Sequence, residues 1–108
     1  MLRWGVRFGP WYPLADAAEH APPSPGVMQV RLAAGLVDYP RGKSAMVWYA
    51  HAANVRDAAT ALAARLAGRA LVCRHLIEID DAVDLAAFYA KLRADFTRRF
   101  GAPPTLSQ

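Results

Sequence analysis

Residues 26–33 (GVMQVRLA) and 45–50 (AMVWYA) decide the fold that we expect for this chain. Polar and apolar residues alternate along the first segment, which is the period of two typical of a β-strand with unlike faces. The second segment is rich in β-branched and aromatic residues, which favour strands. Pro40 and Gly42 lie between them and favour a loop. The two segments therefore predict an antiparallel hairpin with a long loop.

Two helices and a third strand are expected after this hairpin. Asn54 is a favourable helix N-cap, and apolar residues then recur at spacings of three and four until Gly68. Residues 70–79 (ALVCRHLIEI) are apolar at both parities and predict a strand covered on both faces. Asp80 and Asp81 favour the positive end of a last helix, whose apolar stripe would be Leu85, Phe88, Tyr89, Leu92 and Phe96. This order predicts an α/β (α+β) fold, with a three-stranded antiparallel sheet flanked by helices.

The length of 108 residues, 55% of them hydrophobic, fits one domain. We expect residues 1–108 to form it, with a lead-in segment at 1–24, a core at 25–101 and a tail at 102–108. Prolines and glycines punctuate the lead-in segment and leave room only for a short helical turn around 14–20. No apolar run is long enough to cross a membrane, and no secretory signal is evident, so we expect a cytoplasmic protein without a membrane partner.

Motifs for nucleotides, metals and nucleophilic catalysis fail on inspection. Residues 41–44 (RGKS) end like a phosphate-binding loop, but Gly35 and Gly42 are too far apart for that motif, and a strand follows. The three histidines lie in different elements without a metal-ligand spacing, so we expect no metal and no cofactor. Cys73 is the single cysteine, and we expect it to be a small buried hydrophobic residue in a reducing compartment.

Three short motifs resemble the GIY-YIG endonuclease superfamily. They are PPSPGVM at 22–28, VWYA at 47–50 and Asn54-Val55-Arg56. The resemblance covers residues 22 to about 66 by motif, and the rest of the chain by the order of elements alone. It implies a GIY-YIG-like fold and a phosphodiesterase site built around the two strands and the first helix.

The catalytic residues of that family are replaced in this chain. The first motif tyrosine falls on Met28, the second motif begins at Trp48 and has its glycine at Ala50, the family's arginine falls on Ala58, and the metal-binding glutamate falls near Tyr89. In the family, phosphodiester hydrolysis needs an activated nucleophile, a divalent ion and a cation on the developing charge. None of these side chains supplies them. We therefore expect no catalytic residue at these positions.

Three neighbouring side chains could take over the lost chemistry: Tyr49, His51 and Asp57. We interpret them instead as a strand-packing residue, a surface histidine and a first-turn carboxylate that favours the helix dipole. The sequence thus favours a protein without enzymatic activity, and leaves a takeover by these three residues open.

One hypothesis for a catalytically silent domain is weak, sequence-independent binding of DNA or RNA. The net charge is +4, which permits attraction to phosphate. Basic side chains around an aromatic ring can contact phosphate while the ring stacks on an unpaired base. The residues expected to bind nucleic acid are Arg31, Arg41, Lys43, Trp48, His51 and Arg56.

The other hypothesis is a protein-interaction or dimerisation module. Met28, Met46 and Trp48 share one parity on the hairpin and would form an apolar patch for a protein partner or a second copy in a homodimer. The aromatics Trp4, Phe8, Trp11 and Tyr12 precede the hairpin, and they are alternative cover for the same patch. A continuous basic groove beside Trp48 would favour nucleic-acid binding, and an exposed apolar face would favour the interaction module.

Overall fold

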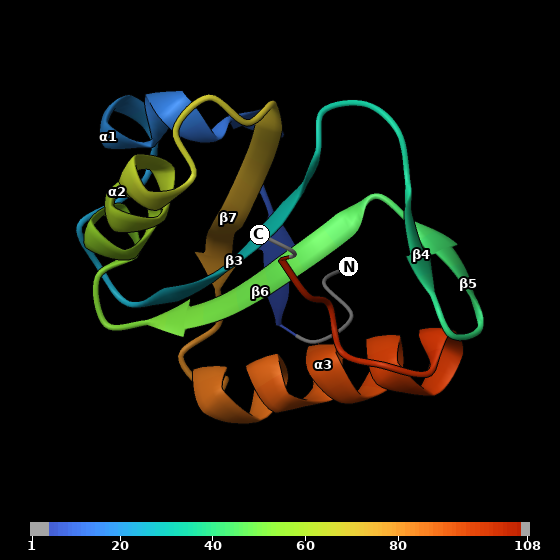
Figure 1. Ribbon diagram of the computed structural model, residues 1–108. Helices are drawn as coiled ribbons and strands as arrows, with labels where there is room; N and C mark the ends of the chain where they lie inside the picture. The colour runs from blue at the N-terminus through green and yellow to red at the C-terminus, as the bar shows by residue number, and fades with distance from the viewer. Residues whose placement is uncertain (1–4, 107–108) are drawn as a thin grey trace.

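An antiparallel sheet lies at the centre of the computed structural model, which describes residues 5–106 (Figure 1). Its three longest strands are β3 (Gly26–Leu32), β6 (Met46–Ala52) and β7 (Leu71–Ile79). β3 is in the middle and pairs antiparallel with β6 on one side and with β7 on the other. The three strands expected from the sequence, and the pairing of the first two, are confirmed.

The expectation of a three-stranded sheet is wrong, because this sheet has five strands. β1 (Val6–Phe8) and β2 (Tyr12–Pro13) both pair antiparallel with β7, and they come from the segment expected to be only a lead-in. Each is two or three residues long and lies among glycines and prolines, so no alternation is visible in the sequence.

The long loop between β3 and β6 contains a small sheet of its own. β4 (Val37–Tyr39) pairs with β5 (Gly42–Ser44). The Tyr39 ring packs edge-on against Phe96 with centroids 5.0 Å apart, and its hydroxyl donates a hydrogen bond to the Met46 carbonyl oxygen at 2.7 Å. These contacts fix the loop against the last helix and the start of β6.

Helices cover both faces of the sheet (Figure 1). The helical turn expected around 14–20 is present as η1 (Leu14–Asp16) and α1 (Ala17–His20), and it lies beside α2 (Val55–Arg65) on one face. The other face carries α3 (Leu85–Phe100), which ends at Gly101 in a left-handed conformation that suits glycine.

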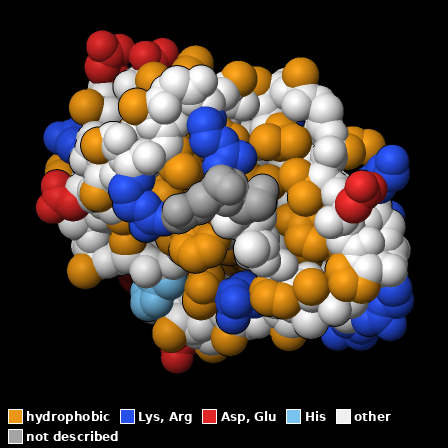
Figure 2. Space-filling model, viewed as in Figure 1, with side chains coloured by type: hydrophobic (Ala, Val, Ile, Leu, Met, Phe, Trp, Pro, Cys, Tyr) orange, Lys and Arg blue, Asp and Glu red, His pale blue; other side chains and the backbone are white. Residues whose placement is uncertain are grey.

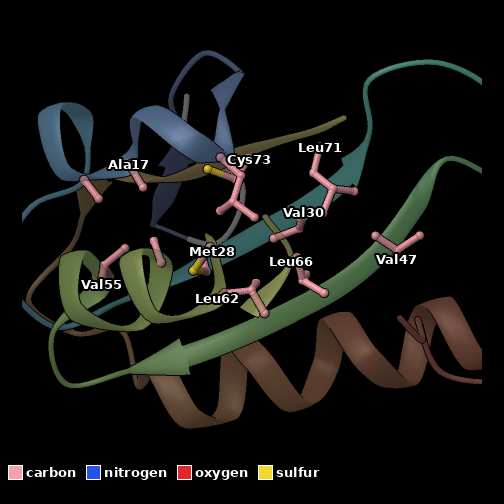
Figure 3. Packing of buried hydrophobic residues seen from close by; sticks show 12 residues of the cluster. Ala17, Met28, Val30, Val47, Val55, Leu62, Leu66, Leu71 and Cys73 are labelled. Atoms are coloured by element: carbon pink, nitrogen blue, oxygen red, sulfur yellow. The ribbon is translucent and has the colours of Figure 1, made fainter. Parts of the chain in front are cut away.

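The main core lies between the sheet and α2 (Figure 3). Alternate strand residues such as Met28, Val30 and Cys73 point towards α2 and are buried. The lead-in segment supplies three further buried residues, Leu14, Ala17 and Ala21. Cys73 is fully buried in this core, as the sequence predicts, and burial raises the pKa of its thiol to about 11.

The face towards α3 is less completely covered. Of the stripe expected on α3, Phe96 is buried and the other four residues are partly exposed. In β7, Ile77 and Ile79 are 45% and 39% exposed, so the expectation that 70–79 is covered on both faces fails at its carboxyl end. Ile77 and Ile79 share the parity of Cys73 along β7, so they lie on the opposite face of the sheet from α3, at the end of β7 beyond its paired residue His75.

Candidate functional site

A cleft of about 180 Å³ lies between β6 and α2. Met28 pairs with Ala50 and Val30 with Trp48, so the side chains of Met28, Trp48 and Ala50 all turn towards α2. Apart from Arg65, every described residue that lines the cleft is apolar; the lining is Met28, Trp48, Ala50, Ala58, Ala61, Leu62 and Arg65. Trp48 is 38% exposed, so part of its indole faces solvent.

Four positions singled out by the GIY-YIG resemblance meet in this cleft. Met28 comes from β3, Trp48 and Ala50 from β6, and Ala58 from the first half of α2. Tyr89, the position nearest the family's glutamate, lies on α3 across the sheet, with its ring centroid 6.3 Å from that of His51. The cleft therefore unites residues from three elements but contains no carboxylate in its described lining.

The three side chains that could have restored catalysis do not line this cleft. Tyr49 packs edge-on against Phe96 at 5.9 Å on the α3 face, and burial raises its pKa to about 12. His51 lies on the same face, is exposed and stacks near Tyr89. Asp57 is exposed in the first turn of α2, where its backbone N–H donates to Asn54 Oδ1. These positions match the ordinary roles expected for them.

The residues predicted to bind nucleic acid are dispersed over the molecule. Trp48 lines the cleft and His51 faces α3, as described above. The guanidinium of Arg31 lies 4.0 Å from the centroid of the Trp11 ring. Arg56 points back to the lead-in segment, where its Nε donates a hydrogen bond to the Ala21 carbonyl oxygen at 2.8 Å. Arg56 thus helps to hold the lead-in segment on α2.

The two predicted loop cations lie at the end of α3. The Arg41 backbone N–H donates a hydrogen bond to the Phe100 carbonyl oxygen at 2.9 Å. The Arg41 guanidinium donates a second one to the Thr97 carbonyl oxygen at 3.4 Å. Lys43 forms an exposed ion pair with Asp38 at 3.5 Å. Figure 2 shows Lys and Arg side chains scattered among apolar patches on the visible face. Of the six residues predicted to bind nucleic acid, only Trp48 lines the cleft.

A cation–aromatic cluster that sequence patterns missed lies on the α3 face. The guanidinium of Arg74 lies 4.6 Å from the ring centroids of both Trp11 and Phe8, and Arg31 lies over the same Trp11 ring. Arg74 Nε donates to the buried Gln29 at 2.8 Å, and burial and then Arg31 lower the pKa of Arg74. Only the strand register, which the sequence does not show, brings these residues together.

The aromatics considered as cover for the apolar patch lie elsewhere. Phe8 and Trp11 contact Arg74, and the Tyr12 hydroxyl is 2.8 Å from His75 Nδ1. Trp4 lies outside the described residues. Met46 does not line the cleft either, because the register of β3 and β6 shifts and Met46 pairs with Arg31. The cleft beside Trp48 is therefore not closed by Phe8, Trp11 or Tyr12.

Within residues 5–106, no cluster of His, Cys, Asp and Glu side chains could hold a metal ion. In the same part of the chain, no helix has the length and apolar character needed to cross a membrane. Comparison with protein-family models, with curated proteins and with solved structures finds no match for this chain.

Proposed function

We propose that this chain is a GIY-YIG-like protein-interaction module, in which the former nuclease cleft accepts an apolar side chain of a protein partner. The observation that carries the proposal is the meeting of Met28, Trp48, Ala50 and Ala58 in one cleft with an apolar lining. A site for phosphodiester hydrolysis would present polar and charged groups at these positions.

The dimensions and chemistry of the cleft define the partner. Its volume of about 180 Å³ is below the several hundred Å³ typical of cofactor pockets, and it suits one side chain. The exposed part of Trp48 offers the kind of aromatic anchor that dominates many protein interfaces. Arg65 adds a cation beside the apolar surface. The preferred partner therefore carries an apolar or aromatic side chain near a carboxylate.

A fluorescent probe with the same two features tests the cleft. Anilinonaphthalene sulfonate carries aromatic rings and one anionic group, and we expect its fluorescence to rise on binding to the dilute protein. Ala61→Glu would place a carboxylate in the cleft and weaken binding by about tenfold or more, a penalty of about 1.4 kcal/mol.

The matched control is Ala64→Glu, one helical turn further along α2. Ala64 is also exposed but does not line the cleft, and glutamate suits a helix at both positions. Equal binding by the two variants would contradict a recognition site in the cleft. If both variants lose probe binding while they stay folded, a recognition site in the cleft is contradicted as well.

Weak nucleic-acid binding stays a second candidate because of the Arg31–Trp11–Arg74 cluster. Neither arginine forms an ion pair with a carboxylate of the described residues, and Trp11 is partly exposed. Two cations beside an aromatic ring suit phosphate and a stacked base. The affinity for a single-stranded oligonucleotide would then fall steeply as the salt concentration rises. Arg31→Gln would lower this affinity further, whereas Arg93→Gln, at an exposed residue of α3, would leave it unchanged. No binding at low salt would discard this candidate.

A further inference from the structure

The cation–aromatic cluster on the α3 face follows from the register of β3 and β7. Gln29 pairs with Arg74, and Arg31 pairs with Val72. Side chains alternate along a strand, so Gln29 and Arg31 share a face with Arg74, and the two arginines are diagonal neighbours across the strand pair. The other face of the sheet carries Met28 and the cleft. The cluster is therefore separate from the cleft.

Two aromatic rings and one amide hold the guanidinium of Arg74 in place. The guanidinium lies 4.6 Å from the ring centroids of both Phe8 and Trp11, close enough for cation–π attraction. Its Nε donates a hydrogen bond to Oε1 of Gln29 at 2.8 Å, and Gln29 is itself buried. The terminal nitrogens of Arg74 donate to no acceptor within residues 5–106. Most donors of this fixed guanidinium are therefore available to a ligand.

Arg31 brings a second positive charge to the same ring. Its guanidinium lies 4.0 Å from the centroid of Trp11. Burial, and then the charge of Arg31, lower the pKa of Arg74, so the two cations are close enough to repel each other. Within the described part of the chain, neither arginine forms an ion pair.

The carboxylates of the neighbouring elements have other partners. β7 and α3 contain one acidic residue each. Glu78 of β7 pairs with Arg7, and Asp95 of α3 pairs with Lys91 and Arg98. The two arginines of the cluster are thus like charges, both partly buried, without a counterion among residues 5–106. Because each loses hydration and repels the other, a bound anion would offset both costs.

We propose that Arg31 and Arg74 form a binding site for a phosphate monoester, the dianionic group that small phosphorylated molecules and the ends of nucleic acids share. Two guanidinium groups match its two negative charges, and each can donate paired hydrogen bonds to phosphate oxygens. Both arginines and Trp11 are partly exposed, so the site is open to solvent. Gln29 is a positioning residue, because it acts through Arg74.

This ligand differs from the one that weak nucleic-acid binding would use. Internal phosphodiesters carry one negative charge each, and single-strand binding adds bases stacked on aromatic rings. Both guanidiniums already lie over Trp11, so recognition of a monoester rests on its phosphate and needs no stacked base. The site is independent of the proposed function, since the cleft lies on the other face of the sheet.

An NMR titration with two small esters of the same shape tests the proposal. At about pH 7.5 methyl phosphate is a dianion, whereas methyl sulfate carries one negative charge. We expect methyl phosphate to cause saturable shifts of the Trp11 indole N–H and the Arg74 Nε–H resonances, and methyl sulfate to bind about tenfold more weakly or worse. Equal affinities for the two esters, or no saturable shift of either resonance, would overturn the proposal.

Two arginine variants show whether the cluster is the site. We expect Arg31→Gln to weaken binding of methyl phosphate about tenfold or more, because it removes one of the two cations. Arg93→Gln is the matched control, since it removes the same charge from an exposed residue of α3 and should leave the affinity unchanged. The same affinity in both variants would contradict the assignment.

Gln29→Glu tests the missing counterion. The glutamate would place a carboxylate beside Nε of Arg74, and we expect it to shift the Arg74 Nε–H resonance and to abolish binding of methyl phosphate. Wild-type affinity in this variant would contradict the account. Melting of each variant shows whether it is folded, and the Arg31 and Arg93 pair keeps the test decisive if Gln29→Glu fails to fold.

Two further comparisons identify the source of the phosphate and separate this site from the cleft. A single-stranded oligonucleotide is compared with and without a 5′-phosphate. Tighter binding of the phosphorylated form supports a monoester at a nucleic-acid end, and equal binding beside a positive result with methyl phosphate supports a small phosphate ester. Ala61→Glu, in the cleft, should bind methyl phosphate as the wild type does. Failure of either site is thus recognised without the other.

Discussion

Single residues determine the character of the cleft. Met28 is 1% exposed and occupies the position at which the GIY-YIG resemblance places a tyrosine, and it brings a flexible thioether there and no hydroxyl. Trp48 and Ala58 occupy positions at which the same resemblance places groups that could contact phosphate. Because all three side chains line one cleft, they give it an apolar surface between β6 and α2.

His75 makes the stability of the protein dependent on pH. Burial, and then His20, lower the pKa of His75 below its ordinary value of 6.5, and Nδ1 is 2.8 Å from the Tyr12 hydroxyl. As the pH falls, His75 therefore takes up a proton near pH 6.5 in the unfolded chain, and only at a lower pH in the folded chain. The stability that neutral His75 contributes is complete above pH 6.5. It is lost as the pH falls from there through the lower pKa of His75 in the folded chain.

We expect the free energy of unfolding in urea to decrease between about pH 7.5 and pH 5.5, and to decrease less in His75→Gln. The glutamine keeps an acceptor for the Tyr12 hydroxyl but does not titrate. His51→Gln, at an exposed histidine, serves as the control and should keep the wild-type dependence. A decrease in His75→Gln as large as in the wild type would contradict this account.

At the scale of elements, both long helices depend on their N-caps. Asn54 Oδ1 accepts from the Asp57 N–H at 3.0 Å, and Asp84 Oδ1 accepts from the Ala87 N–H at 3.2 Å. We expect Asn54→Ala and Asp84→Ala each to lower the free energy of unfolding by about 1 kcal/mol, measured by urea denaturation. Asp81→Ala, at an exposed aspartate outside the helix, should change it by less than about 0.5 kcal/mol. Equal effects of all three substitutions would show that the caps do not matter.

The elements that the sequence predicts well are those with long periodic patterns. The alternation in 26–33, the spacing after Asn54 and the stripe on the last helix each extend over several residues, and the structure confirms the strands and helices that they predict. β1 and β2 are too short for any periodicity and exist because the edge of β7 offers them backbone partners. Tertiary pairing of this kind cannot be inferred from local pattern.

The candidate site was predictable in part for the same reason. Met28 and Trp48 share a face because strand residues alternate, and Ala58 reaches them because α2 folds back over β6. The predicted cations, in contrast, scatter because surface arginines carry no periodic signal that places them. Arg31 and Arg74 are brought together only by the register of β3 and β7.

At the scale of the whole molecule, the lead-in segment is part of the core. Leu14, Ala17 and Ala21 are buried against α2, and β1 and β2 complete the sheet beside β7. We therefore expect a fragment of residues 25–101 to lose cooperative thermal unfolding by circular dichroism, whereas residues 1–108 unfold cooperatively. A cooperative transition in the fragment, with dispersed amide resonances, would show that the lead-in segment is dispensable.

Methyl NMR of the alanines tests the central claim, that the Trp48 cleft is an apolar recognition site, most directly. During titration with anilinonaphthalene sulfonate, the account predicts saturable shifts of the Ala50, Ala58 and Ala61 methyl resonances, while those of Ala17 and Ala21 in the buried core stay unchanged. Unchanged cleft resonances, or shifts of the core alanines of the same size, would contradict it.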